Sequence, residues 1–374
     1  MEILTIIFFA IVALYSMLIL WFSYGFRKVK TFENDSFQPA TGFSIIVPFR
    51  NEAKNLPTLL HSFSQLDYPR SKFEIIFVDD VSEDNSIEII ANFPASSFSF
   101  SIIDTIRKSN SPKKDAIETA IEKVSHDWIV TTDADCFVDQ NWLKTLDNYV
   151  QIHNPKMIAG AVSVLANDSF LEQFQQLDLM SLQGATIGSF GINKGFMCNG
   201  ANFAYTKKSF QELDGFIGNN QISSGDDVFL LQKAMAKYPE KVHYLKSEDA
   251  IVLTKPVNDW STLFFQRVRW ASKSSSYQSV FGKIVALIVF AGNFTIVLSF
   301  FLTLFSLFSF WTWYLLFAIK IFIDFLLLNQ AGKFLKPRAI KFFLISNLIY
   351  PFFSTSVALY SLFGKYEWKG RSLR

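Results

Sequence analysis

The stretch Phe43-Ser-Ile-Ile-Val47 decides the fold, because it is a short apolar run that ends at Pro48. Its length and composition are typical of a buried strand. Three later runs have the same character, at residues 73–78, 99–103 and 128–131. Helical spacing of apolar residues fills the intervals, at residues 55–66, 86–92 and 115–124. Strands that alternate with helices predict an α/β domain with a parallel sheet and right-handed crossovers, over residues 42–256.

The first 25 residues predict a membrane anchor. Residues 3–22 are an almost unbroken apolar run, which is long enough to cross a bilayer as a helix. A cleavable signal peptide is the alternative, but it needs a basic start, whereas here the basic residues Arg27, Lys28 and Lys30 follow the run. We therefore expect an uncleaved transmembrane helix over residues 1–25, with the following domain in the cytoplasm.

The C-terminal region, residues 281–374, contains three further apolar segments, at residues 284–308, 311–328 and 340–363. The basic linker that contains Lys333 and Lys336 favours a cytoplasmic position between the last two segments. Four full crossings would however place the C-terminal basic residues outside, against the same rule: Lys365, Lys369, Arg371 and Arg374. Either the last segment is re-entrant, with a bend near Pro351, or one of the segments does not cross, and the sequence leaves both alternatives open.

Composition excludes some classes of function. The chain of 374 residues is 50% hydrophobic with 42 Phe, and its net charge of +2 gives no case for nucleic-acid binding. Cys136 and Cys198 are interpreted as free thiols in a reducing compartment. No glycine-rich phosphate loop is present, and the four histidines have no metal-ligand spacing: His61, His126, His153 and His243.

Carboxylates follow two of the predicted strands. Asp79 and Asp80 come directly after the second strand, where they could accept hydrogen bonds from a ribose or a base, although Asp is also a common turn residue. Asp133 and Asp135 follow the fourth strand. A solvated turn is the alternative interpretation of this pair. Hard oxygen ligands, however, suit Mg²⁺ or Mn²⁺ bound to a diphosphate. Because ligands bind beyond the carboxyl ends of parallel strands, we favour the metal site.

A second acidic pair, Asp226 and Asp227, opens a predicted helix. Capping and the helix dipole would explain it, and a general base that deprotonates an acceptor hydroxyl is the functional alternative. Lys113 and Lys114 precede another predicted helix and are either surface lysines or donor contacts.

Basic and aromatic residues occur together in the amphipathic segment 257–280, which precedes the C-terminal apolar region. Gln266, Arg269 and Trp270 either lie at the lipid headgroup level or serve the reaction, with Arg269 stabilising a diphosphate leaving group.

Taken in order, these motifs resemble those of the family 2 glycosyltransferases with the GT-A fold, a Rossmann-like fold of nucleotide-diphospho-sugar transferases. The resemblance covers residues 43–270. It implies donor-binding roles for Pro48, Arg50, Glu52, Asp79, Asp80, Lys113 and Asp133. It implies Mg²⁺ or Mn²⁺ on Asp133 and Asp135. It implies catalytic roles for Asp227 as the base and for Asp226, Gln266, Arg269 and Trp270. The acceptor site would contain Asn199, Gly200, Asn202 and Trp270.

Two residues depart from the family pattern, since Arg50 replaces a common aromatic residue and Asp226 replaces the more usual Glu. The resemblance implies inverting transfer of one sugar from a nucleotide diphosphate to a lipid or saccharide acceptor at the cytoplasmic membrane. A processive polysaccharide synthase of the same family is one alternative. A nucleotide-binding transporter and a nonenzymatic scaffold are others.

Overall fold

The four predicted strands are all present in the computed structural model, and they run parallel in the order β3-β2-β1-β4. Their bounds are β1 Phe43–Phe49, β2 Phe73–Asp79, β3 Phe100–Asp104 and β4 Trp128–Thr131. The three predicted helices are also present, as α2 Leu56–Ser64, α3 Ser86–Ala91 and α4 Pro112–Ile121. The structure describes residues 2–363 except 36, 95, 221, 223, 338 and 339, together with 366–368 and 371–373.

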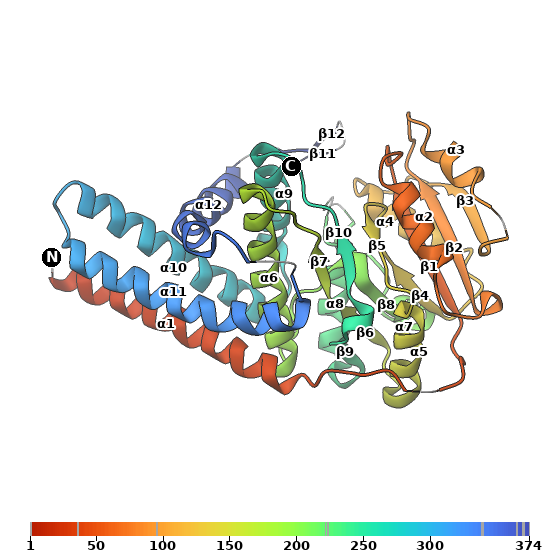
Figure 1. Ribbon diagram of the computed structural model, residues 1–374, viewed down its shortest axis with the longest axis horizontal. Helices are drawn as coiled ribbons and strands as arrows, with labels where there is room; N and C mark the ends of the chain where they lie inside the picture. Colours follow the sequence, from red (N-terminus) through yellow and green to blue (C-terminus); the bar gives the residue numbers. More distant parts are fainter. Residues whose placement is uncertain are drawn as a thin grey trace.

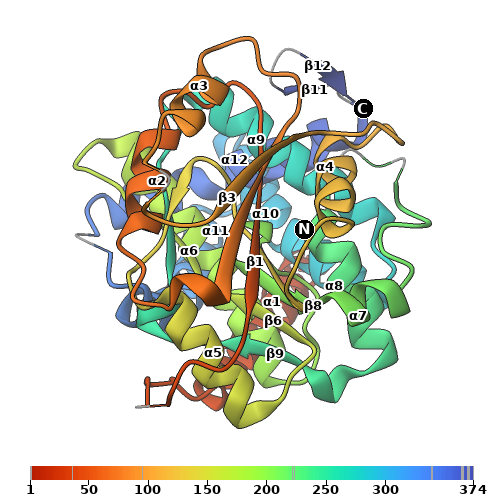
Figure 2. The ribbon, with the colours of Figure 1, turned by 90° about the vertical axis from the view of Figure 1, so that its right-hand side faces the viewer.

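Both faces of the sheet are buried, which explains the continuous apolar runs in its strands. Alternate residues of β1 point to opposite faces: Ile45 packs with α2 and with α5 (Trp142–His153), whereas Ile46 packs with α4 and with α8 (Asp226–Lys237). Figure 2 looks onto this domain and shows α2 and α5 on one side of the sheet and α4 and α8 on the other. The result is a three-layered α/β domain.

The second half of the sheet is mixed and lies beyond the four strands that the sequence predicted. It contains β8 (Phe203–Thr206), β6 (Met157–Gly160) and β9 (Val242–Leu245), and β8 runs antiparallel to both β4 and β6. The reason is local: the short helix η2 (Gly200–Asn202) directly precedes β8 and lies where β4 ends, because Phe203 pairs with Thr131. The chain must therefore return along β4, and η2 is placed beside the residues that follow β4.

The remaining elements complete the domain. A small sheet joins β5 (Cys136–Phe137), β10 (Val252–Thr254) and β7 (Val162–Val164). Two helices, α6 and α9, lie between the sheets and the apolar helices (Figure 1). The other bounds are α6 Phe170–Gly191, α7 Lys207–Glu212, α9 Trp260–Ser272, η1 Arg70–Lys72, η3 Pro239–Lys241, η4 Glu248–Ala250, η5 Lys273–Ser276, β11 Tyr366–Trp368 and β12 Arg371–Leu373.

Four helices are long and apolar enough to cross a membrane, namely α1 (Glu2–Lys28), α10 (Val280–Leu304), α11 (Phe310–Leu335) and α12 (Phe343–Phe363). Of the four, α12 is the least apolar. Figure 1 shows α1, α10 and α11 side by side along the long axis of the molecule, whereas α12 lies across them and is seen nearly end-on. The helix α12 continues through Pro351 without interruption. The least apolar of the four helices is therefore also the one with a different direction.

Glycines allow α1 to contact α6 backbone to backbone. A Cβ atom on Gly25 would lie 2.1 Å from the carbonyl oxygen of Gly188, and one on Gly191 would lie 1.8 Å from the carbonyl oxygen of Gly25. No residue with a side chain fits at these positions without moving a helix. The first helix is thus packed directly against the α/β part of the chain.

Candidate active site

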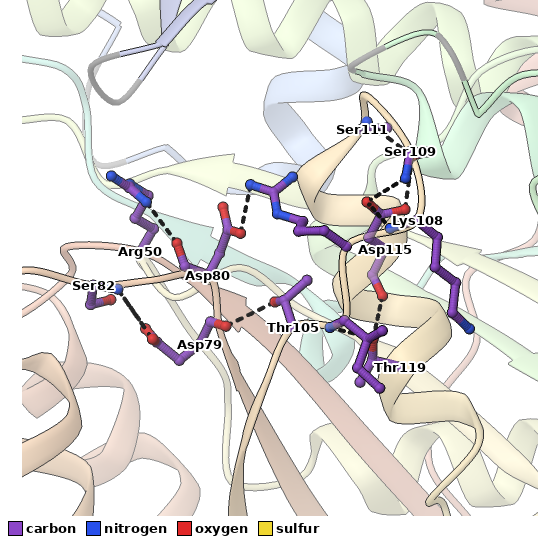
Figure 3. Close-up of polar contacts among 12 residues, drawn as sticks. Arg50, Asp79, Asp80, Ser82, Thr105, Lys108, Ser109, Ser111, Asp115 and Thr119 are labelled. Atoms are coloured by element: carbon purple, nitrogen blue, oxygen red, sulfur yellow. Dashed lines mark hydrogen bonds and ion pairs between the residues drawn. The ribbon is translucent and has the colours of Figure 1, made fainter.

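The first group of polar side chains lies at the carboxyl end of β2, and Figure 3 shows it in close-up. Both carboxylate oxygens of Asp79 accept a hydrogen bond from the backbone N–H of Ser82, at 3.1 Å. Arg50 donates to the carbonyl oxygen of Asp80 at 2.8 Å, and Arg107 pairs with the Asp80 carboxylate at 2.8 Å. Asp79 and Asp80 are each only 5% exposed, so this edge of the sheet is a fixed polar surface.

The loop after β1 joins the same group. Pro48 is the penultimate residue of β1, and its neighbour Phe49 is paired with Asp79. The backbone N–H of Glu52 donates to Ser86 at 2.8 Å, at the start of α3. The structure thus brings together the five residues expected at the nucleotide end of a donor: Pro48, Arg50, Glu52, Asp79 and Asp80.

A second group surrounds the ammonium of Lys113. This nitrogen lies 2.6 Å from Asp133 and 3.4 Å from Asp226, which come from the end of β4 and the first turn of α8. Lys113 itself is in the first turn of α4, because that helix begins at Pro112 rather than at the predicted residue 115. Gly200 also belongs here, since a Cβ atom on it would lie 3.0 Å from the Asp226 carboxylate. Segments distant in sequence therefore meet at one point.

The other lysine at the start of α4 has a different role. The Lys114 side chain is buried and donates hydrogen bonds to the carbonyl oxygens of Asn219 and Ile222, at 2.6 and 2.9 Å. Burial lowers the pKa of Lys114 to about 8, against the attraction of Asp226. This lysine holds the segment that leads into α8.

Asp227 is held by both backbone and side-chain groups. Its carboxylate accepts hydrogen bonds from the N–H groups of Gly200 and Val228, at 2.9 and 2.7 Å, and Lys273 lies 3.7 Å away. Burial by itself would raise the pKa of Asp227, but Lys273, Lys113 and the two N–H groups outweigh it, so the pKa lies below its ordinary value. Asp227 is therefore ionised at neutral pH and able to accept a proton.

The acidic residues line one cavity of about 880 Å³. Asp133, Asp135, Asp226 and Asp227 all contribute to its wall. So do most of the other residues expected near the sugar and the acceptor: Lys113, Asn199, Gly200, Gln266, Arg269 and Trp270. Residues separated by more than 90 positions thus share a single space that is large enough for a ligand.

Asn202 is placed elsewhere. Its side-chain nitrogen donates to the carbonyl oxygens of Ala161 and Ala250, at 2.8 and 2.7 Å, and its oxygen accepts from Trp142 at 3.1 Å. The residue is 3% exposed and is not part of the cavity wall. Its amide thus binds the two connections between the large and the small sheet, and Asn202 is not part of the acceptor site that we propose.

The donor set of the cavity fits a divalent metal. Asp133 and Asp135 supply hard oxygen atoms to the same wall, although no group of three His, Cys, Asp or Glu side chains suitable for a metal occurs among the described residues. Mg²⁺ is commonly held by only one or two carboxylates, with substrate phosphates and water completing the shell. A pair of aspartates beside a space for a diphosphate is in keeping with that arrangement.

The segment 266–270 lies on α9, as its amphipathic pattern predicts. Gln266 accepts a hydrogen bond from Arg267, and the Arg267 guanidinium stacks on Trp270 with 4.1 Å between its central carbon and the ring centre. Arg267 also donates to Asp178 of α6, and both side chains are buried. The segment therefore fastens α9 to α6 and also lines the cavity.

Sequence reasoning missed Lys273 and the pair of Arg267 with Asp178. Lys273 follows Arg269 by four positions, at the end of α9, and residues four apart lie on one face of a helix. That spacing was a usable signal. Asp178 gave none, because it lies within a helix that was not predicted. Cys136 and Cys198 are free thiols, and burial raises the pKa of both.

The order of the strands and the acidic residues at their ends define a GT-A fold. A mannosyltransferase of Pyrobaculum calidifontis, PcManGT, solved with GDP-Man and Mn²⁺, has the same fold, with a TM-score of 0.59 at 17% identity over 96% of this chain and 99% of that one. Residues 44–214 match the model named Glycosyl transferase family 2.

Curated relatives agree with this family over part of their length. Over 256 residues the chain is 25% identical to the poly-beta-1,6-N-acetyl-D-glucosamine synthase of Staphylococcus epidermidis, which is 66% of this chain and 59% of that protein. Over 101 residues it is 33% identical to the glycosyltransferase AglE of Haloferax volcanii, which is 27% of this chain and 33% of AglE. The chain thus spans less than two thirds of the length of either relative.

Proposed function

We propose that the protein is an inverting glycosyltransferase that moves a single sugar from a nucleotide diphosphate to a hydroxyl group of a membrane-associated acceptor. One observation carries the proposal: Asp133, Asp135 and Asp227 line one cavity, which also touches helices long enough to span a membrane. The family model that matches residues 44–214 and the GDP-Man bound to PcManGT support a nucleotide-sugar donor.

Each part of the site has a role in this reaction. The fixed polar surface at Asp79 and Asp80 binds the nucleoside, two strand positions from Asp133 and so on the order of 10 Å away. The acceptor oxygen attacks the anomeric carbon while the bond from that carbon to the phosphate oxygen breaks. Asp227 takes the acceptor proton, and the nucleotide diphosphate leaves. Because the attack comes from the face opposite the leaving group, the configuration at the anomeric carbon inverts.

Negative charge on the leaving diphosphate requires compensation. Lys113 and Arg269, which line the cavity, would supply part of it. Asp133 and Asp135 would hold Mg²⁺ or Mn²⁺, which supplies further positive charge to the diphosphate when it is bound. The Mn²⁺ in the PcManGT complex supports this choice of metals.

A panel of UDP- and GDP-sugars tests the function, with the full chain in detergent, membrane lipid extract as acceptor, and mass spectrometry of the products. We expect release of nucleotide from one donor, and a loss of metal-dependent donor binding of about 10-fold or more in Asp135→Ala. Binding without release would favour a transporter or a scaffold. Products with many added sugars would favour a processive synthase, the alternative supported by the name of the Staphylococcus relative.

We propose that α1, α10 and α11 cross the membrane and that α12 lies along the cytoplasmic surface. This arrangement follows the directions of the helices in Figure 1 and removes the conflict over the C-terminal basic residues, of which Lys365, Lys369 and Arg374 lie outside the described residues. It places the α/β domain and the C-terminus on one side. Epitopes added at the two termini should therefore be accessible to protease from opposite sides of sealed vesicles. Access to both from one side would contradict three crossings.

A further inference from the structure

The cavity that contains the acidic residues continues beyond the α/β domain. Its wall includes Tyr15 of α1, Val289 of α10, Asp324 of α11 and Phe353 of α12, so all four apolar helices contribute to it. An acceptor in this cavity can therefore reach from Asp227 into the region of the apolar helices.

The wall between α10 and α12 is largely apolar and reaches the surface, although Lys283, Ser354 and Ser361 also line it. On α10 it contains Ala286 and Leu287, and on α12 it contains Ala358 and Leu362. Leu287 and Leu362 are 66% and 63% exposed, although both line the cavity. An exposed apolar residue in a cavity wall marks a place where the cavity meets its surroundings, and here those surroundings are the sides of candidate membrane helices.

The two helices are in contact elsewhere. Phe352, in the middle of α12, packs on Phe300 and Phe301 of α10, with ring centres 5.4 and 6.2 Å apart. The residues of the apolar wall lie in the first turns of α10 and the last turns of α12, away from this contact. The opening is therefore on one side of the point where the helices cross. We call it the lateral opening and define it by Ala286, Leu287, Ala358 and Leu362.

We propose that the acceptor is a lipid alcohol that enters through the lateral opening, with its hydroxyl group at Asp227 and its hydrocarbon chain between α10 and α12. This inference rests on the proposed function and names its acceptor class. A lipid chain finds mainly apolar side chains along this path, whereas a saccharide would leave most of its hydroxyl groups without hydrogen-bond partners, because few polar side chains line it. The lipid oxygen bonds to the anomeric carbon while the bond from that carbon to the phosphate oxygen breaks. The lipid proton passes to Asp227, and the nucleotide diphosphate leaves.

A pair of neighbouring variants tests the lateral opening. Ala358 lines the cavity, whereas Leu359 is 42% exposed and does not. We expect Ala358→Trp to fill the opening and lower the transfer of labelled sugar into the organic phase by about 10-fold or more. Leu359→Trp, the matched control on the same helix, should transfer at the wild-type rate. Both variants are assayed as full chains in lipid nanodiscs, and binding of UDP and GDP is measured alongside.

The outcomes separate the two proposals. Unchanged transfer in Ala358→Trp, or labelled sugar on a water-soluble product, would overturn the lipid acceptor while leaving sugar transfer intact. A wild-type protein that consumes no donor would overturn the proposed function itself. If Ala358→Trp no longer binds nucleotide, which would indicate misfolding, Ala286→Phe on the facing helix is tested in its place. It is judged by the same two readouts.

Discussion

Sugar transfer by Asp227→Asn is expected to be slower than wild-type transfer by about 10²–10⁴-fold, the range associated with loss of a general base. The amide has nearly the same size. Its oxygen can still accept the hydrogen bond from Gly200 but its nitrogen cannot accept the one from Val228, so the amide keeps one of the two backbone hydrogen bonds. It cannot, however, take up the acceptor proton. We expect the loss to appear in kcat, with the Kd of the donor nucleotide within about twofold of the wild type.

The matched control for this variant is Glu240→Gln, which makes the same chemical change at an exposed site in η3. Its transfer rate should equal that of the wild type. If Asp227→Asn retained full activity, the base would have to be another group, and Asp226 would be the next residue to replace.

Arg267→Ala is expected to have the largest effect on stability, a loss of roughly 3–5 kcal/mol in the free energy of unfolding. The side chains of Arg267 and Asp178 are 8% and 5% exposed, so removal of the guanidinium leaves a carboxylate buried without its partner. The stacking on Trp270 is lost as well. Thermal unfolding of the purified protein in detergent measures the loss.

The double variant Arg267→Met with Asp178→Leu provides the control. It removes both charges and keeps similar volumes, so it should recover most of the stability lost in Arg267→Ala. Equal unfolding temperatures for Arg267→Ala and the wild type would show that the pair contributes nothing to the joint between α6 and α9.

The parallel half of the sheet and its acidic edge could be predicted because their signals are local. The runs before Asp79 and Asp133 are buried strands that end in carboxylates, and parallel order then places those carboxylates at one edge. The convergence of Asp227 with them could not be derived from spacing and entered only through the family resemblance. It depends on the antiparallel strand β8. This strand has four residues, which is too short for a recognisable alternation of apolar and polar side chains.

The helix α6 was missed for a different reason. It is buried on several sides, and its buried residues include polar ones such as Gln173, Gln176 and Asp178. A helix of this kind has no separate polar and apolar faces, so the pattern that reveals amphipathic helices is missing. The pair of Asp178 with Arg267 was hidden together with the helix that carries it.

The glycine contact between α1 and α6 gives the first helix a second role besides that of a membrane anchor. Tyr15, Ile19 and Phe22 of α1 belong to the cavity wall, and Gly25 holds them there through its contact with Gly188. A protein that lacks its first 28 residues would lose one part of the cavity wall together with the first apolar helix. Under the proposed function, one helix serves both membrane attachment and the cavity wall, and a foreign hydrophobic leader would not supply Tyr15, Ile19 and Phe22.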